Sequence, residues 1–311
     1  MNNNKENNNE KSCASTSINW FPGHMAKTRR QIEEDLKLVD IVVEMLDARI
    51  PIASQNPDLK QIMEKNPNGK KKIVVLNKSD IADEKETKRW LEYFQQKNII
   101  AISTDSNSGK GINECIRKIE KEMEEELAKS AQKGRIGRKI KVMIVGIPNV
   151  GKSSFINRIA KKNSAEVGNK PGVTKRKQWI RINETVELLD TPGVLWPKFE
   201  SQEVALNLSY TGTIKDDILD KVEVAYQLLR YLLYNYKTNV INRYNFSEQE
   251  IDEILNRDEE ENINIYEIMQ KIGRKRGAIR AGGEVDDEKN ARLILDDFRN
   301  CKLGKITLEK V

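Results

Sequence analysis

The chain has 311 residues, of which 38% are hydrophobic and 33% charged, and its formal net charge is +6 at pH 7. No apolar run reaches the length of a membrane span, which excludes an integral membrane protein, and the length allows two domains. Its three cysteines, Cys13, Cys115 and Cys301, lack metal-binding or redox spacing, which suits a reducing compartment. We expect a cytoplasmic monomer that does not bind membranes.

The amino-terminal end is polar. Residues 1–17 are rich in asparagine and lack the apolar core of a signal peptide, so they are predicted to form a disordered tail. Pro22 and Gly23 then indicate a turn. A helix that carries Ile32 and Leu36 is expected after it.

Short apolar runs alternate with helical patterns in the next part of the chain. Strands are predicted at 40–46, 72–76, 99–102 and 141–145, and a strand pair at 178–182 and 186–189. Helices are predicted at 83–97, 112–127 and 153–160. Strands that are apolar throughout and alternate with helices indicate a parallel sheet covered on both faces.

The pattern becomes wholly helical from about residue 209. One helical face is predicted from Ile218, Val222, Ala225, Leu229 and Leu232. Ser247 and Glu250 form a capping box that opens a second helix. Two more helices are expected at 263–271 and 287–301.

The stretch from Gly146 to Ser153 fits the phosphate-binding loop G-x-x-x-x-G-K-[ST] and lies between a predicted strand and a predicted helix. Gly146 and Gly151 allow the backbone to curl around phosphate oxygens, and Lys152 would neutralise the β- and γ-phosphates. The loop's expected nucleotide contacts come from Asn149, Val150, Gly151, Lys152, Ser153 and Ser154.

The motif Asn77–Asp80 (N-K-x-D) follows a predicted strand, as a guanine-reading motif does. The Asp80 carboxylate would accept hydrogen bonds from guanine N1–H and N2, neither of which adenine offers on that edge. Asn77 would support the loop, and Lys78 would lie along the ring. Backbone N–H groups of Ser103 and Thr104 are expected to meet guanine O6.

Mg²⁺ ligands are predicted in three separate segments. The Ser153 hydroxyl would bind Mg²⁺ directly, Asp190 would hold it through water, and Thr174 would join when GTP is bound. The Gly193 N–H would sense the γ-phosphate. The segment after Gly193 leads into the helical part, so its nucleotide-dependent motion is predicted to move that part.

The guanine-reading motifs precede the phosphate loop, although in ordinary small GTPases they follow it. This order predicts an α/β, P-loop GTPase fold with circularly permuted motifs at residues 18–205 and an all-helical C-terminal domain at 206–311. The order and five motifs resemble the ribosome biogenesis GTPase A (RbgA/YlqF) family. These motifs are Phe21–Met25, Asp47–Pro51, Gly146–Ser153, Pro171–Thr174 and Asp190–Gly193.

The resemblance spans residues 18 to about 200. It implies a GTPase that acts late in assembly of the large ribosomal subunit, with a helical domain that contacts ribosomal RNA. The expected partners are therefore the large-subunit precursor, its RNA and its proteins. Two alternatives remain: an RNA-binding checkpoint that uses GTP mainly as a ligand, and a permuted GTPase that acts on another RNA.

Hydrolysis is expected to depend on His24, Lys152 and Gly193. Position 194, where Ras-like enzymes carry a water-orienting glutamine, is Val194. His24 is the only histidine, and an imidazole that titrates near pH ~6.5 can orient water; the family resemblance points the same way. The alternative is that His24 only caps a turn. Asn149 is either a loop hydrogen bonder or, as in similar GTPases, a K⁺ ligand.

Basic residues gather at 135–141, at 170–177 and in the helical domain. Clusters beside a GTPase fold favour an RNA partner. In the helical domain the expected contacts are Lys271, Arg274, Lys275, Arg276 and Arg280.

Overall fold

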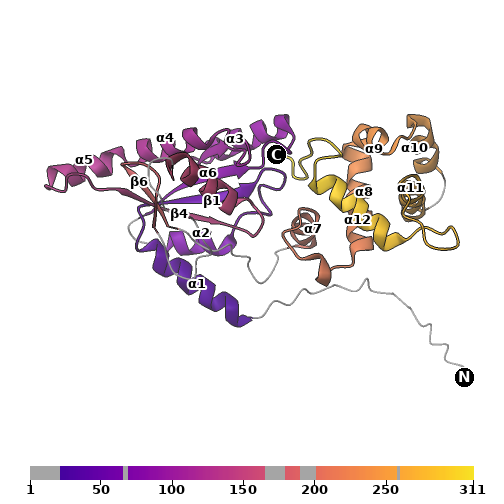
Figure 1. Cartoon of the computed structure of the whole chain (residues 1–311), viewed down its shortest axis with the longest axis horizontal. Helices are drawn as coiled ribbons and strands as arrows, with labels where there is room; N and C mark the ends of the chain where they lie inside the picture. The colour runs from indigo at the N-terminus through magenta and orange to yellow at the C-terminus, as the bar shows by residue number, and fades with distance from the viewer. Residues whose placement is uncertain (1–21, 66–68, 165–178, 190–200, 258–259) are drawn as a thin grey trace, which may run out of the picture.

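The computed structural model describes residues 22–65, 69–164, 179–189, 201–257 and 260–311, and gives no side-chain description for 22–28 and 161–164. Figure 1 shows an α/β part followed by a helical part, which agrees with the predicted fold class. No helix within these ranges is long and apolar enough to cross a membrane.

The α/β part is built on a sheet with the strand order β3-β2-β1-β4-β6-β5. The strands are β1 (Ile41–Asp47), β2 (Lys71–Asn77), β3 (Ile100–Ser103), β4 (Ile140–Gly146), β5 (Trp179–Arg181) and β6 (Val186–Leu189). All neighbouring pairs are parallel except β5 and β6, which are antiparallel. The prediction of a parallel sheet with one added strand pair is therefore confirmed.

Helices cover both faces of this sheet because the central strands are apolar on both sides. Val43 and Met45 of β1 belong to one core cluster, with α4 (Ile112–Glu122) and α6 (Lys152–Ser164). The alternate residues Val42 and Leu46 face α1 (Pro22–Leu36), α2 (Pro57–Glu64) and α3 (Glu84–Gln96). The period-two alternation along β1 decides which helix packs where.

Several helix boundaries differ from the prediction. The expected helix at 112–127 breaks at Met123, where α4 ends and α5 (Glu124–Gln132) begins. Pro22 is the first residue of α1 and not part of a turn, which fits the preference of proline for the first helical position. Ile218 does not share the predicted helical face, since it lies in a separate 3₁₀ turn, Asp216–Ile218, and is half-exposed.

The first helix after the sheet begins at Gln202, a few residues before residue 206. The helices of the helical part are α7 (Gln202–Tyr210), α8 (Lys221–Asn235), α9 (Lys237–Tyr244), α10 (Glu248–Leu255), α11 (Glu261–Lys275) and α12 (Asp287–Arg299). The predicted cap of α10 is confirmed, because the Ser247 side chain accepts from Glu250 N. The exact division into domains stays a prediction.

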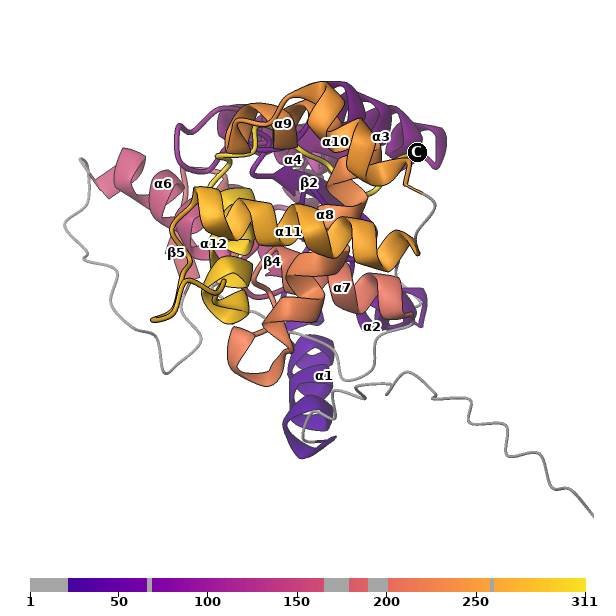
Figure 2. The same cartoon turned by 90° about the vertical axis from the view of Figure 1, so that its right-hand side faces the viewer.

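The last ten residues return to the α/β part, so that both parts share one continuous hydrophobic core. Leu308 N donates to Arg49 O at 2.8 Å, and Trp90 Nε1 donates to Glu309 O at 2.9 Å. Figure 2 views the molecule from the helical side, with α8, α11 and α12 in front of the sheet. The C-terminal segment therefore fastens the helical part beside the carboxyl ends of the strands.

Candidate guanine-nucleotide site

The predicted nucleotide motifs meet at one edge of the sheet. Asp47, Asn77, Ser103 and Gly146 end the neighbouring parallel strands β1, β2, β3 and β4. In the register of the sheet, Asp47 pairs with Asn77, and Gly146 pairs with Met45 two residues before the end of β1. Since carboxyl ends of parallel strands share an edge, motifs far apart in sequence form one site.

The phosphate loop needs both of its framing glycines, but for different reasons. Gly151 has a φ of +98°, and a Cβ there would lie well inside 3.0 Å of Asn77 Nδ2. Gly146 has an ordinary φ, but a Cβ there would lie 2.6 Å from Met45 O on the adjacent strand. A side chain at either position would disturb the loop.

Lys152 begins α6 and turns its ammonium group back over the loop. Its Nζ donates to Gly146 O at 2.8 Å and to Ile147 O at 3.0 Å. The side chain is buried, whereas those of Ser153 and Ser154 in the same helical turn are exposed. A positive charge is thus held at the helix N-terminus, which is the arrangement that binds phosphate.

Asn77 joins the guanine-reading loop to the phosphate loop. Its Nδ2 donates to Val150 O at 2.7 Å. Its Oδ1 accepts from Thr104 Oγ1 at 3.0 Å, Ser106 N at 3.2 Å and Ser106 Oγ at 2.7 Å. One buried side chain thereby fixes three segments relative to one another.

Asp80 fits the expected guanine reader. Its Oδ1 is buried and has no hydrogen-bond partner among the described residues. Burial and the nearby Asp105 carboxylate raise the pKa of Asp80 above its usual value. A carboxylate in such surroundings is stabilised by paired N–H donors, and the Watson–Crick edge of guanine provides two.

Thr104 takes a different place from the predicted one. Its N–H donates to Leu76 O at 2.8 Å, so this arrangement does not support the expected contact of that group with guanine O6. Its side chain is fully buried against Asn77, and Thr104 O accepts from Ser79 N at 3.1 Å. Thr104 therefore supports the guanine-reading loop through its contacts with Asn77 and Ser79.

A buried ion pair at the end of β1 also supports this loop. The Asp47 carboxylate binds Arg49 through two contacts, Nε to Oδ1 at 2.9 Å and Nη2 to Oδ2 at 2.7 Å, and Lys78 Nζ lies 3.1 Å from Oδ2. Burial alone would raise the pKa of Asp47, but Arg49 and Lys78 together lower it far below its usual value. Lys78 itself has a φ of +62°.

Arg49 connects this ion pair to the helical part. Only 2% of its surface is exposed, its guanidinium lies 5.2 Å from the centre of the Phe298 ring of α12, and Nη1 has no hydrogen-bond partner among the described residues. From sequence, Asp47 and Arg49 entered only as part of a family motif. An acidic residue at a strand end with arginine two positions later was the available signal.

The helical part also contacts the phosphate loop. Asn149, with a φ of +60°, donates from Nδ2 to Gly212 O at 2.7 Å. Gly212 lies in the turn after α7, and Arg299 of α12 holds this turn by donating to Ser209 O at 2.8 Å and Tyr210 O at 3.0 Å. This contact uses the amide nitrogen of Asn149, while its amide oxygen accepts no hydrogen bond from the described residues.

Other predicted site residues are only partly described. His24 lies in the first turns of α1, but its side chain is outside the description. Thr174, Asp190 and Gly193 lie outside the described residues, so Ser153 is the one expected Mg²⁺ ligand within them. No group of three or more His, Cys, Asp or Glu side chains placed to hold a metal occurs within the described ranges.

The predicted basic cluster of the helical part is only partly neutralised by neighbouring acids, since its five cations face two carboxylates. Lys271 and Lys275 both lie near Glu250, at 3.1 and 3.7 Å, because α10 packs on α11. Arg280 pairs in the same way with Asp286, at 3.3 Å. Arg274 and Arg276 are exposed. Acidic residues between 248 and 261 form further ion pairs in this part: Lys237–Glu248, Lys237–Asp252 and Arg230–Glu261.

Comparisons with known proteins agree with this geometry. A family model described as 50S ribosome-binding GTPase matches residues 141–271. Ribosome biogenesis GTPase A of Bacillus cereus is 45% identical over 292 residues, which cover 94% of this chain and 93% of that protein. The GDP-bound structure of TM YlqF has a TM-score of 0.63 at 26% identity and covers 90% of this chain and 99% of its own. GNP-bound YlqF from T. maritima has a TM-score of 0.61 at 26% identity, with coverages of 91% and 98%.

Proposed function

We propose that this protein is a GTP-hydrolysing assembly factor for the large ribosomal subunit. The premise is that the chain belongs to the ribosome biogenesis GTPase A family. Membership makes it a GTPase of ribosome biogenesis. The finer proposal is that it binds the large-subunit precursor through ribosomal RNA and ribosomal proteins, and that this particle stimulates hydrolysis. The observation that supports a guanine-specific switch is the buried Asp80 Oδ1, which has no hydrogen-bond partner within the part of the chain that the structure describes.

In this proposal, guanine is read by Asp80 and flanked by the stem of Lys78. The phosphates lie against the backbone of Asn149, Val150 and Gly151, with Lys152 at the β- and γ-phosphates. Ser153 and Ser154 follow at the N-terminus of α6. Asn77 keeps the base-reading and phosphate-binding halves in register through its contact with Val150 O.

Hydrolysis transfers the γ-phosphoryl group from GTP to water and gives GDP and phosphate. Lys152 and the loop N–H groups stabilise the charge that develops on the phosphate oxygens. His24 would orient the attacking water, because Val194 has no group that can hydrogen-bond to it. The N–H of Gly193 would contact the γ-phosphate.

Two cations belong to this proposal. Mg²⁺ would neutralise phosphate charge, held by Ser153, Thr174 and Asp190. The exposed Ser153 hydroxyl on the first turn of α6 fits that role. K⁺ would supply a positive charge near the bond that breaks, with the Asn149 amide oxygen as its ligand. The hydrogen bond from Asn149 Nδ2 to Gly212 O orients the amide, and its oxygen has no partner among the described residues, which supports this role.

The decisive experiment is steady-state turnover of GTP and ATP by the full-length protein, in K⁺ or Na⁺ buffer, with and without purified large ribosomal subunits. We expect the protein to hydrolyse GTP but not ATP, and to do so faster in K⁺ than in Na⁺ buffer. Large subunits should raise the rate by orders of magnitude. Small subunits serve as the matched particle control. Under the same stimulated conditions, His24→Ala should lose most of the turnover.

Each other outcome has a distinct meaning. If large subunits do not change the rate of GTP turnover, the result would favour an RNA-binding checkpoint that uses GTP as a ligand. If small subunits or another RNA stimulate turnover, that particle or RNA would be the partner. Equal rates in K⁺ and Na⁺ would contradict the role of Asn149. Sedimentation of the free protein tests the further proposal that it is a monomer, and cell fractionation tests the cytoplasmic location.

A further inference from the structure

A cavity of about 620 Å³ opens at the edge of the sheet opposite to the nucleotide site. Its walls come from residues 37–40 between α1 and β1, from Lys70 before β2, and from residues 135–141, which lead from α5 into β4. These segments meet at the amino ends of the parallel strands. A ligand there would leave the nucleotide loops at the carboxyl ends untouched.

The lining of this cavity is strongly basic. Its charged side chains are the cations Lys37, Lys70, Arg135, Arg138, Lys139 and Lys141 and the acids Asp40 and Glu187. We call these residues, together with Leu38 and Ile136, the amino-edge surface. Such an excess of cations creates a positive potential that attracts anions.

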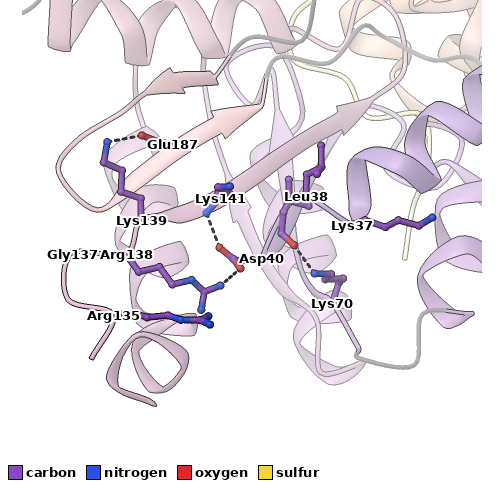
Figure 3. Close-up of a pocket in the computed structure, with 11 residues that line it drawn as sticks. Lys37, Leu38, Asp40, Lys70, Arg135, Gly137, Arg138, Lys139, Lys141 and Glu187 are labelled. Atoms are coloured by element: carbon purple, nitrogen blue, oxygen red, sulfur yellow. Dashed lines mark hydrogen bonds and ion pairs between the residues drawn. The ribbon is translucent and has the colours of Figure 1, made fainter. Parts of the chain in front are cut away.

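Both acids of the amino-edge surface are already neutralised within the protein. Asp40 accepts from Arg138 and, at 2.9 Å, from Lys141 N. Glu187 pairs with Lys139 at 2.5 Å. These contacts, drawn in Figure 3, fix the walls of the cavity and leave the remaining cations uncompensated.

Lys37 and Arg135 are the cations available to a ligand. Both are exposed, and neither side chain has a hydrogen bond or ion pair within the part of the chain that the structure describes. Figure 3 shows them on opposite sides of the cavity. A single small anion would need donors that converge on one point, whereas separated cations match the repeated charges of a polyanion.

Two exposed apolar side chains adjoin these cations in the sequence, and one of them, Leu38, lines the cavity. Ile136 is 89% exposed and Leu38 46% exposed, and both are flanked in sequence by residues of the basic lining. Apolar contacts beside phosphate-binding cations suit sugars and bases of a folded nucleic acid.

We propose that the amino-edge surface binds the sugar-phosphate backbone of folded RNA, separately from the helical part. This rests on the proposed function, since it names a second RNA contact of the same assembly factor. In the helical cluster Lys271, Lys275 and Arg280 lie near acids of their own domain, whereas Arg274 and Arg276 are exposed, so the amino-edge surface would add to the contact that these arginines make. The α/β part therefore makes its own contribution to RNA affinity.

The test compares full-length wild type with Lys37→Gln/Arg135→Gln. The probe is a labelled fragment of large-subunit ribosomal RNA, titrated at several salt concentrations. The matched control is Lys85→Gln/Lys88→Gln, which removes two exposed cations from the start of α3 at the other edge of the sheet, neither with an ion pair to another described residue. Thermal unfolding and GTP turnover without RNA establish that each variant is folded and active.

We expect the Lys37/Arg135 variant to bind RNA about five- to tenfold more weakly near physiological salt, with a slope of log affinity against log salt smaller by about two. The control should match wild type. Equal RNA affinities and slopes in the two double variants would overturn the proposal. Loss of binding to complete subunits without loss of binding to RNA would also overturn it, and would assign the surface to a ribosomal protein. Failure of wild type itself to bind RNA or large subunits would instead refute the proposed function.

Discussion

Replacing Asn77 by alanine tests whether one side chain holds the nucleotide site together. The change removes four hydrogen bonds and leaves Val150 O, Thr104 Oγ1 and the Ser106 groups without that partner in a buried place. A hydrogen bond contributes about 1 kcal/mol net, and an orphaned buried group costs more. We therefore expect the free energy of unfolding to fall by about 2–4 kcal/mol.

The affinity for GDP should fall as well, by at least about tenfold, since the register between the phosphate loop and the guanine loop is lost. Urea unfolding and fluorescence titration with labelled GDP measure the two effects. Asn107→Ala is the matched control, because Asn107 is an exposed asparagine in the same loop region. If the free energy of unfolding of Asn77→Ala stays within about 0.5 kcal/mol of the control, and its affinity for GDP within about threefold, Asn77 does not organise the site.

Three further changes test other parts of the structure. Gly151→Ala should abolish measurable GDP binding while the protein still unfolds cooperatively, because its Cβ would meet Asn77 Nδ2; unchanged affinity would contradict this. Arg49→Met should lower the free energy of unfolding in urea by about 3–5 kcal/mol, since it leaves the buried Asp47 carboxylate with Lys78 as its one cationic partner among the described residues; a loss under about 1 kcal/mol would refute this expectation. Burial raises the pKa of the Glu309 carboxyl from 4.5 to about 7. Between these two pH values the folded protein holds a proton on Glu309 that the unfolded chain has lost. The stability that Glu309 contributes is therefore complete below pH 4.5 and is lost as the pH rises through 7. The free energy of unfolding of the wild type should therefore fall by up to about 3 kcal/mol more than that of Glu309→Gln between pH 4.5 and 8. Parallel pH profiles of the two proteins would contradict the raised pKa of Glu309.

The sheet and its order of motifs were predictable because they depend on local patterns. Apolar strands such as 72–76 and the glycines of the phosphate loop carry their signal within a few residues. The break at Met123 was not predictable from periodicity, since the apolar positions continue across it. The helix that carries Ile32 and Leu36 was predicted, but its start at Pro22 was not, because proline followed by glycine is also typical of a turn.

The site was predictable in its motifs but not in its supports. Asp80 and Lys152 belong to short motifs whose chemistry can be read directly. Phe298, by contrast, contacts Arg49 across a sequence separation that no local pattern encodes. The same holds for Glu309, whose carboxylate accepts from Ile52 N and Ala53 N after the chain has returned to the α/β part.

These distant contacts change the expected route of coupling between the two parts. From sequence, the segment after Gly193 was the expected link. The described residues add a link at the end of α12, where Phe298 packs on Arg49 and the adjacent Arg299 holds the turn that contacts Asn149. This helix end contacts Arg49 directly and reaches the phosphate loop through the turn at Gly212, so we expect a partner that displaces α12 to disturb both halves of the nucleotide site. A stimulus delivered to the helical part can therefore reach the phosphate loop without passing through the segment after Gly193.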